Sequence, residues 1–232
     1  MAIQQTEQLL THSLPDGSHP QLRGSARRCG GRPLPAASSA DGTVRVRDLG
    51  SADGGSADLV MQVRAHTGRI RSPAFDGTGE RLATAGGEGI ARVWAVADSA
   101  CTAEFVSSGG WVRYVCLDAT AQRLAIGEGP GELHVYDVAS CQTAAVLEGH
   151  NGRVLMLAVG DGPDVLVSAA ADGTVGAWSI SRSRQLVQVR VDASLNCAAF
   201  DPDTAIVLAG SANGTTAVGV PDVVGRREDP NG

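Results

Sequence analysis

The sequence contains no lysine, and all 19 of its basic residues are arginine. This absence excludes several kinds of active site from the chain. A phosphate-binding P-loop requires a lysine, and so do Schiff-base catalysis and the ATP site of a protein kinase. Because a lysine-free chain rich in alanine, glycine and arginine is typical of a GC-rich genome, we expect a bacterial source.

Net positive charge and long apolar runs are also missing. The net charge is −6, with 25 acidic residues against the 19 arginines, whereas a nucleic-acid binder needs a basic surface. No apolar run reaches the length of about 18 residues that a membrane span needs. The N-terminus lacks the basic segment and apolar stretch of a signal peptide. We therefore expect a cytoplasmic protein without nucleic-acid or membrane partners.

Cysteine is sparse and follows no functional spacing. The five cysteines are odd in number and widely separated, at positions 29, 101, 116, 141 and 197. This pattern matches neither a zinc site nor the disulfide framework of a small secreted protein. No other cluster of metal-ligating residues stands out in the sequence, so we expect no metal and no cofactor.

The sequence does contain a glycine-rich turn followed by a short apolar segment, and this unit recurs. Its turn positions are occupied by Asp41, Glu88, Pro130, Asp172 and Asn213, which are separated by 47, 42, 42 and 41 residues. A period of this size indicates a repeat architecture.

The segment 147–180 and the residues just after it show the unit most fully. An almost wholly apolar run predicts a first strand that is buried on both faces. The pair Asp172-Gly173 predicts a two-residue hairpin of the primed type. The four predicted strands cover residues 154–159, 165–168, 174–178 and 185–191. One such antiparallel sheet cannot bury both its faces, so the copies must stack, and radial stacking gives a β-propeller.

The Gly-His turn at 149–150, the Asp-Gly turn and the closing tryptophan resemble the WD-repeat family over roughly residues 37–220. The resemblance implies a buried, hydrogen-bonded tetrad of a histidine, a strand serine or threonine, a turn carboxylate and a tryptophan. By position, the tetrads are His150, Ser168, Asp172 and Trp178 in one repeat and His66, Thr84, Glu88 and Trp94 in another. Since these residue types recur with the repeat, we interpret them as structural and not as a hydrolytic triad.

The middle repeat departs from this pattern. Ser108 stands where the period places the histidine, Pro130 is at the turn, and Tyr136 replaces the tryptophan. We expect this repeat not to build the tetrad.

We therefore predict an all-β propeller of about five four-stranded antiparallel blades, with the first and last incomplete. The predicted blades cover about 37–64, 65–107, 108–149, 150–191 and 192–220. Residues 1–36 contain several prolines, which cannot donate to a strand ladder, so we expect a poorly ordered leader. Residues 221–232 are expected to form a tail. An open arc, a strained small ring and self-association through open blade edges remain as alternatives.

The leading functional hypothesis is a non-catalytic protein–protein interaction scaffold. Propeller loops vary on a rigid framework, which suits recognition. In the WD-repeat family, partners often dock where the chain enters the first strand of each blade. The residues at this candidate rim are Arg69, Arg71, Trp111, Arg113, Arg153 and Asn196. Arginine and tryptophan are enriched at binding hot spots, and the arginines favour acidic or phosphorylated segments of other proteins.

The sequence is also compatible with two other functions. The array resembles the C-terminal WD-repeat region of bacterial multidomain signalling proteins, so the chain is alternatively a sensor or autoinhibitory module, or a fragment, of a nucleotide-switch or kinase protein. A propeller hydrolase or lyase would use the central channel. The predicted first strands offer that channel no carboxylate and no histidine, so general acid–base catalysis lacks its groups and we expect no enzyme.

Overall fold

The computed structural model describes residues 23–29, 32–49, 58–129, 131–159, 164–191, 193–201, 206–211 and 213–219. These residues form strands and connecting turns, with no helix among them. In this part of the chain no helix is long and apolar enough to cross a membrane. The predicted leader before residue 23 and the predicted tail at 221–232 lie outside the described residues.

The described strands form five antiparallel sheets. The first contains β1 (Arg23–Cys29), β2 (Arg32–Ser38), β3 (Thr43–Asp48) and β4 (Asp58–Arg64). The second contains β5 (Ile70–Phe75), β6 (Arg81–Gly86), β7 (Ile90–Ala95) and β8 (Cys101–Val106). The third contains β9 (Val112–Leu117), β10 (Arg123–Glu128), β11 (Leu133–Asp137) and β12 (Thr143–Leu147). The fourth contains β13 (Val154–Val159), β14 (Val165–Ala170), β15 (Thr174–Ser179) and β16 (Arg184–Arg190), and the last contains β17 (Leu195–Asp201), β18 (Ile206–Ser211) and β19 (Gly214–Gly219).

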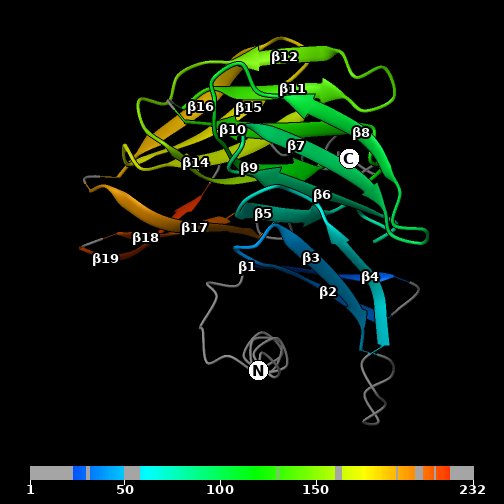
Figure 1. Cartoon of the computed structure of the whole chain (residues 1–232). Coiled ribbons are helices and arrows are strands. Elements are labelled where there is room, and N and C mark those ends of the chain that lie inside the picture. The colour runs from blue at the N-terminus through cyan, green and yellow to red at the C-terminus, as the bar shows by residue number, and fades with distance from the viewer. Residues whose placement is uncertain are drawn as a thin grey trace, which may run out of the picture.

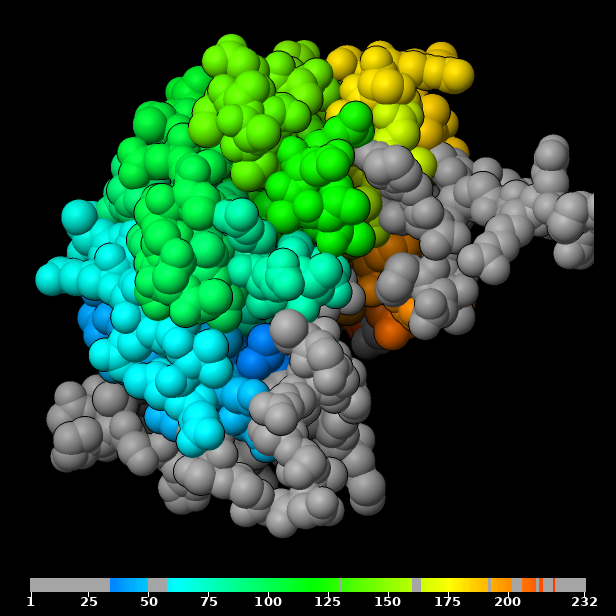
Figure 2. All heavy atoms as spheres, turned by 90° about the vertical axis from the view of Figure 1, so that its right-hand side faces the viewer, coloured from blue at the N-terminus to red at the C-terminus, as the bar shows by residue number. Residues whose placement is uncertain are grey.

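The sheets are arranged as the blades of a propeller. Figure 1 shows them fanned around a common centre, with β1–β4 and β17–β19 as the two end blades. The first strand of each blade contacts the first strand of the next. Seen from the side in Figure 2, the blades follow one another as a continuous surface, from cyan through green to yellow.

The hydrophobic core lies between the blades. Four apolar clusters fill the spaces between successive blades, and each draws residues from both neighbours. Trp178 is wholly buried in the cluster shared by the third and fourth blades. Five blades in a closed ring would share five interfaces. Among the described strands, no contact of comparable extent joins β17–β19 to β1–β4, so the propeller is an open arc.

The two end blades each have one uncovered face. On β18, Val207 and Ala209 are buried against the fourth blade, whereas Leu208, which points to the other face, is 51% exposed. In the fourth blade, which has neighbours on both sides, Val167 of β14 stands at the position of Leu208 and is fully buried, so the open end of the arc leaves Leu208 in solvent.

The first blade differs from the sequence-based expectation. Residues 23–29 and 32–38 form paired strands and not part of a poorly ordered leader, so this blade has four strands. The prolines that argued against a strand are tolerated because β2 pairs with β3 only at residues 36–38. Pro33 and Pro35 therefore lie outside the part of β2 that has a ladder on both sides. The last blade has three described strands, as expected for an incomplete end.

The turn at Asp172 also differs from the prediction. Gly173 has a φ of 86° and donates its amide to the Ala170 carbonyl at 3.2 Å, whereas Asp172 does not adopt a positive φ. The loop is thus a three-residue turn, 171–173, that ends in a left-handed glycine, and not a two-residue primed hairpin. Gly89 has the same φ of 86° in the second blade. This turn directs the acidic side chain toward the loop that precedes the blade's first strand.

Candidate partner-binding site

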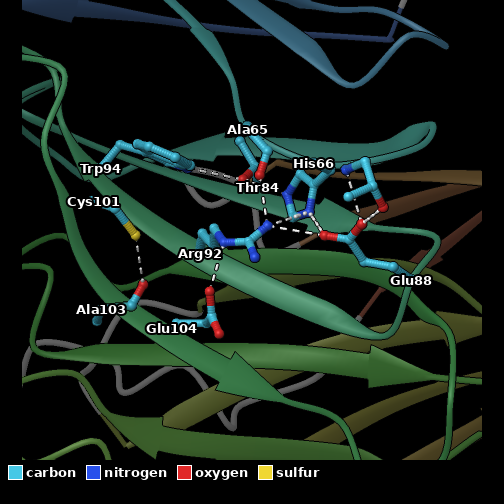
Figure 3. A network of polar contacts seen from close by, with 10 residues as sticks. Ala65, His66, Thr84, Glu88, Arg92, Trp94, Cys101, Ala103 and Glu104 are labelled. Carbon is cyan, nitrogen blue, oxygen red and sulfur yellow. Dashed lines mark hydrogen bonds and ion pairs between the residues drawn. The ribbon is translucent and has the colours of Figure 1, made fainter.

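In the second blade, a buried chain of hydrogen bonds fixes the loop before β5. The indole Nε1 of Trp94 donates to Thr84 Oγ1 at 3.0 Å, and this hydroxyl lies 2.8 Å from His66 Nε2. On the other side of the ring, His66 Nδ1 lies 2.9 Å from Glu88 Oε1. Figure 3 shows these side chains converging between the strands. The sequence-predicted tetrad is therefore assembled, with glutamate in the place of aspartate.

Arg92 and Thr67 extend this network, and sequence reasoning missed both. Arg92 donates to Glu88 Oε1 at 2.9 Å, to the Ala65 carbonyl at 2.6 Å and to Glu104 Oε2 at 2.8 Å. The backbone amide of Thr67 donates to Glu88 Oε2 at 2.9 Å, and its hydroxyl donates to the same oxygen. The available signal was an arginine on the strand just after the turn, within reach of the turn carboxylate.

The protonation states follow from these contacts. Burial lowers the pKa of His66 below its ordinary value, although Glu88 opposes this effect. Burial disfavours the charged form of Glu88, but hydrogen bonds from Thr67, His66 and Arg92 outweigh this and lower its pKa to about 2. At neutral pH the pair is thus a neutral imidazole, with its proton on Nδ1, and a carboxylate.

The fourth blade contains the same elements with one addition. Trp178 Nε1 donates to Ser168 Oγ at 2.7 Å, and this hydroxyl lies 2.6 Å from His150 Nε2. His150 Nδ1 is 3.9 Å from Asp172 Oδ1, which is too long for a hydrogen bond. The Thr174 hydroxyl bridges this gap, at 2.6 Å from each group. Burial lowers the pKa of His150, so the ring is neutral here as well.

The middle blade lacks the tetrad, as predicted, and contains a substitute. Glu128 ends β10 as Gly86 ends β6, and a Cβ added to Gly86 would collide with the His66 ring. A side chain at this position therefore occupies the volume that the imidazole fills in the second blade. The Glu128 side chain is fully buried, and its Oε2 accepts the Gly109 amide at 2.8 Å. The carboxylate thus fixes the loop before β9 in place of both the histidine and the turn acid.

The candidate rim residues come mostly together in one cavity. Arg71, Arg113 and Asn196 are each the second residue of their blade's first strand. The radial arrangement of the blades therefore brings them to the same face of the propeller. Together with Tyr114, Arg153, Val154 and Leu155, they line a cavity of about 190 Å³, which we call the arginine cavity. Arg69, which is exposed, does not line this cavity.

Trp111 lies beside two of the arginines that line the arginine cavity. Its side chain is 56% exposed, and the guanidinium carbons of Arg71 and Arg113 lie 6.0 Å and 5.7 Å from the ring centroid. These are cation–π distances. The tryptophan ring therefore interacts with two guanidinium groups from neighbouring blades.

The electrostatics of the arginine cavity favour an anion. None of the residues that line it is acidic. The Nε of Arg71 is buried and has no hydrogen-bond partner among the described residues. A buried donor without an acceptor costs roughly 1–3 kcal/mol, and a bound carboxylate or phosphate would supply that acceptor.

Comparison with known proteins agrees with the propeller fold. The family model "WD domain, G-beta repeat" matches residues 57–95 and 141–179, which contain β4–β7 and β12–β15. The chain therefore contains WD repeats. Over 84 residues it is 37% identical to the ribosome biogenesis protein ERB1 of Coccidioides immitis. That match covers 35% of the WD-repeat chain and 10% of the fungal protein.

Two solved structures resemble the fold. One is the computationally designed Ika8 protein, with a TM-score of 0.70, 20% identity, and coverage of 88% of this chain and 60% of that one. The other is a chain of the mitotic checkpoint complex, with a TM-score of 0.67, 18% identity, and coverage of 78% and 57%. The WD-repeat chain thus spans less than two thirds of each protein that it resembles, and these two likenesses establish its architecture alone.

Proposed function

We propose that this chain is a non-catalytic scaffold that binds an acidic or phosphorylated segment of another protein in the arginine cavity. Proteins with WD repeats typically act as interaction scaffolds. The proposal rests mainly on the convergence of Arg71, Arg113 and Arg153 on one cavity that has no acidic lining. Guanidinium groups match carboxylates and phosphates through paired hydrogen bonds.

Catalysis is not part of this proposal. His66 and His150 are the histidines that recur with the repeat, and both are buried in hydrogen-bond networks that hold them neutral. A hydrolytic site would instead need an imidazole that reaches a substrate. We further propose, from composition, a bacterial source and a cytoplasmic location.

Fluorescence anisotropy with a fluorescein-labelled hexaglutamate peptide and a phosphoserine-containing peptide tests the proposed binding. Reversing two charges with Arg71→Glu and Arg113→Glu should abolish binding of both peptides. Arg182→Glu is the matched control, because Arg182 is exposed on the β15–β16 turn and does not line the cavity. Equal affinity of the wild type and the double variant would contradict the proposal.

A second candidate function is that of a sensor or autoinhibitory module within a larger signalling protein. The uncovered face that contains Leu208 favours it, because an additional blade would bury this side chain. Size-exclusion chromatography with light scattering on the purified chain separates the two candidates. A stable monomer favours the independent scaffold, and association favours the module.

A further inference from the structure

Three potential metal ligands meet at the turn between β10 and β11. Glu128 ends β10, Glu132 lies in the turn, and His134 is the second residue of β11. One ligand atom from each lies within 4.8 Å of the other two. His134 Nε2 is 3.4 Å from Glu132 Oε2 and 3.9 Å from Glu128 Oε2. The backbone amide of Glu128 donates to the Glu132 carbonyl at 2.9 Å, which closes the turn and brings the two carboxylates together.

The state of Glu128 points independently to a missing ligand. Its side chain has no exposed surface, and only Oε2 receives a hydrogen bond, from the Gly109 amide. Oε1 is buried and has no partner among the described residues. A carboxylate in such a position is costly unless a cation or several donors compensate its charge.

The second blade shows what this compensation looks like. There Arg92 places a guanidinium nitrogen 2.9 Å from the turn carboxylate of Glu88. His134 occupies the equivalent strand position, since His134 pairs with Ile126 as Arg92 pairs with Thr84. Its Nε2, at 3.9 Å, is too far from Glu128 for a hydrogen bond. The middle blade therefore has the carboxylate without the cation.

We propose that Glu128, Glu132 and His134 bind a divalent transition-metal ion of the zinc class. One imidazole and two carboxylates form a ligand set that Zn²⁺ accepts, with bonds of about 2.0–2.2 Å. Tetrahedral bonds of that length separate the ligand atoms by roughly 3.3–3.6 Å. His134 Nε2 is 3.4 and 3.9 Å from the two carboxylates, and the carboxylate oxygens lie within 4.8 Å of each other, so binding requires the side chains to draw together. Glu132 is 43% exposed and gives the ion access from solvent.

The ion would also stabilise the edge of the arginine cavity. Glu128 holds the amide of Gly109, and Trp111 lies two residues further along the same loop. Fixing the Glu128 carboxylate therefore fixes the loop that presents Trp111 to Arg71 and Arg113. This role is structural and does not depend on the identity of the protein partner.

Isothermal titration calorimetry of the full chain with Zn²⁺ alone tests the proposal, with thermal unfolding as a second readout. The wild type should bind one ion at this site, and saturating Zn²⁺ should raise its Tm. His134→Gln and Glu132→Gln should each weaken that binding by about tenfold or more and abolish the rise in Tm. Glu148→Gln is the control, because Glu148 is exposed and outside the cluster.

Glu132 is largely exposed, so Glu132→Gln is expected to fold even where His134→Gln does not. Two results would overturn the proposal. One is a wild type that neither binds Zn²⁺ nor gains thermal stability from it. The other is a Glu132→Gln variant that binds Zn²⁺ as tightly as the wild type, which would place any bound ion elsewhere on the chain.

Discussion

The Asp172 carboxylate does not reach the imidazole of His150, because Oδ1 and Nδ1 are 3.9 Å apart. The Thr174 hydroxyl bridges them by accepting from the ring and donating to the carboxylate. In the second blade, Glu88 is one methylene longer and contacts His66 directly at 2.9 Å, and Ile90 stands where Thr174 does. The fourth blade thus uses aspartate and a bridging hydroxyl, whereas the second blade uses the longer glutamate without a bridging hydroxyl.

This pairing predicts a specific rescue. Glu88→Asp should destabilise the chain by about 1–2 kcal/mol, because the shorter carboxylate leaves His66 Nδ1 without an acceptor. Adding Ile90→Thr to this variant should restore part of the loss by rebuilding the bridge. The coupling energy is measured by urea unfolding of the two single variants and the double variant. If the two changes are simply additive, the proposed compensation is wrong.

Ser168 accepts from Trp178 and donates to His150, so Ser168→Ala removes two buried hydrogen bonds at once. We expect a loss of about 2–4 kcal/mol in the free energy of unfolding, since two polar groups become unpartnered. Ser194→Ala, at an exposed serine, should change stability by less than about 0.5 kcal/mol. Chemical denaturation of both variants checks this difference.

The neutral histidines predict acid sensitivity. The pKa values of His66 and His150 are lowered on folding from 6.5, so the unfolded chain takes up protons first as the pH falls. Their contribution is complete above pH 6.5 and is lost below it, with a slope of at most about 1.4 kcal/mol per pH unit for each histidine.

Glu88 adds a second loss on acidification. Its pKa falls from 4.5 to about 2 on folding, so its contribution to stability is complete above pH 4.5 and disappears between pH 4.5 and about 2.

Urea unfolding across pH 8 to 4 tests the effect of the histidines, and His150→Gln should reduce the slope of stability against pH near pH 6. A stability that stays constant between pH 7 and 5 would contradict the assignment of neutral rings.

The uncovered face of the last blade predicts self-association, and a charge introduced on that face should suppress it. Leu208 is 51% exposed on the outer face of the last blade, and exposed apolar faces favour contact between copies. Leu208→Glu should shift size-exclusion elution toward the monomer at high protein concentration. Val106→Glu is a suitable control, because Val106 is 70% exposed on a blade whose two faces are covered. Equal elution of the two variants would rule out the end face as the contact.

Much of this fold could be predicted from the sequence, because the period, the turns and the closing tryptophans are local signals. The arginine cavity could also be predicted, since Arg71, Arg113 and Asn196 share one offset within their repeats. The bridge through Thr174 could not be predicted, because it depends on the aspartate side chain being about one bond length shorter than that of glutamate.

The substitute network of the middle blade was missed for a related reason. Glu128 is not at the turn position of the repeat, and its role is visible only when it occupies the volume of an absent imidazole. The cluster with Glu132 and His134 likewise forms across a closed turn, with spacings that match no metal-binding motif. The first two strands were missed because Pro33 and Pro35 of β2 lie where its ladder is one-sided.

We expect the arginine cavity to bind an anionic protein segment, and the emission of Trp111 should report this binding. Trp94 and Trp178 are buried, whereas Trp111 is exposed beside Arg71 and Arg113. Titration with unlabelled hexaglutamate peptide should change the tryptophan emission saturably, and Trp111→Phe should remove this change. High salt should weaken the binding. Saturable binding with unaltered Trp111 emission, or no binding at low salt, would show that the peptide does not bind in the arginine cavity.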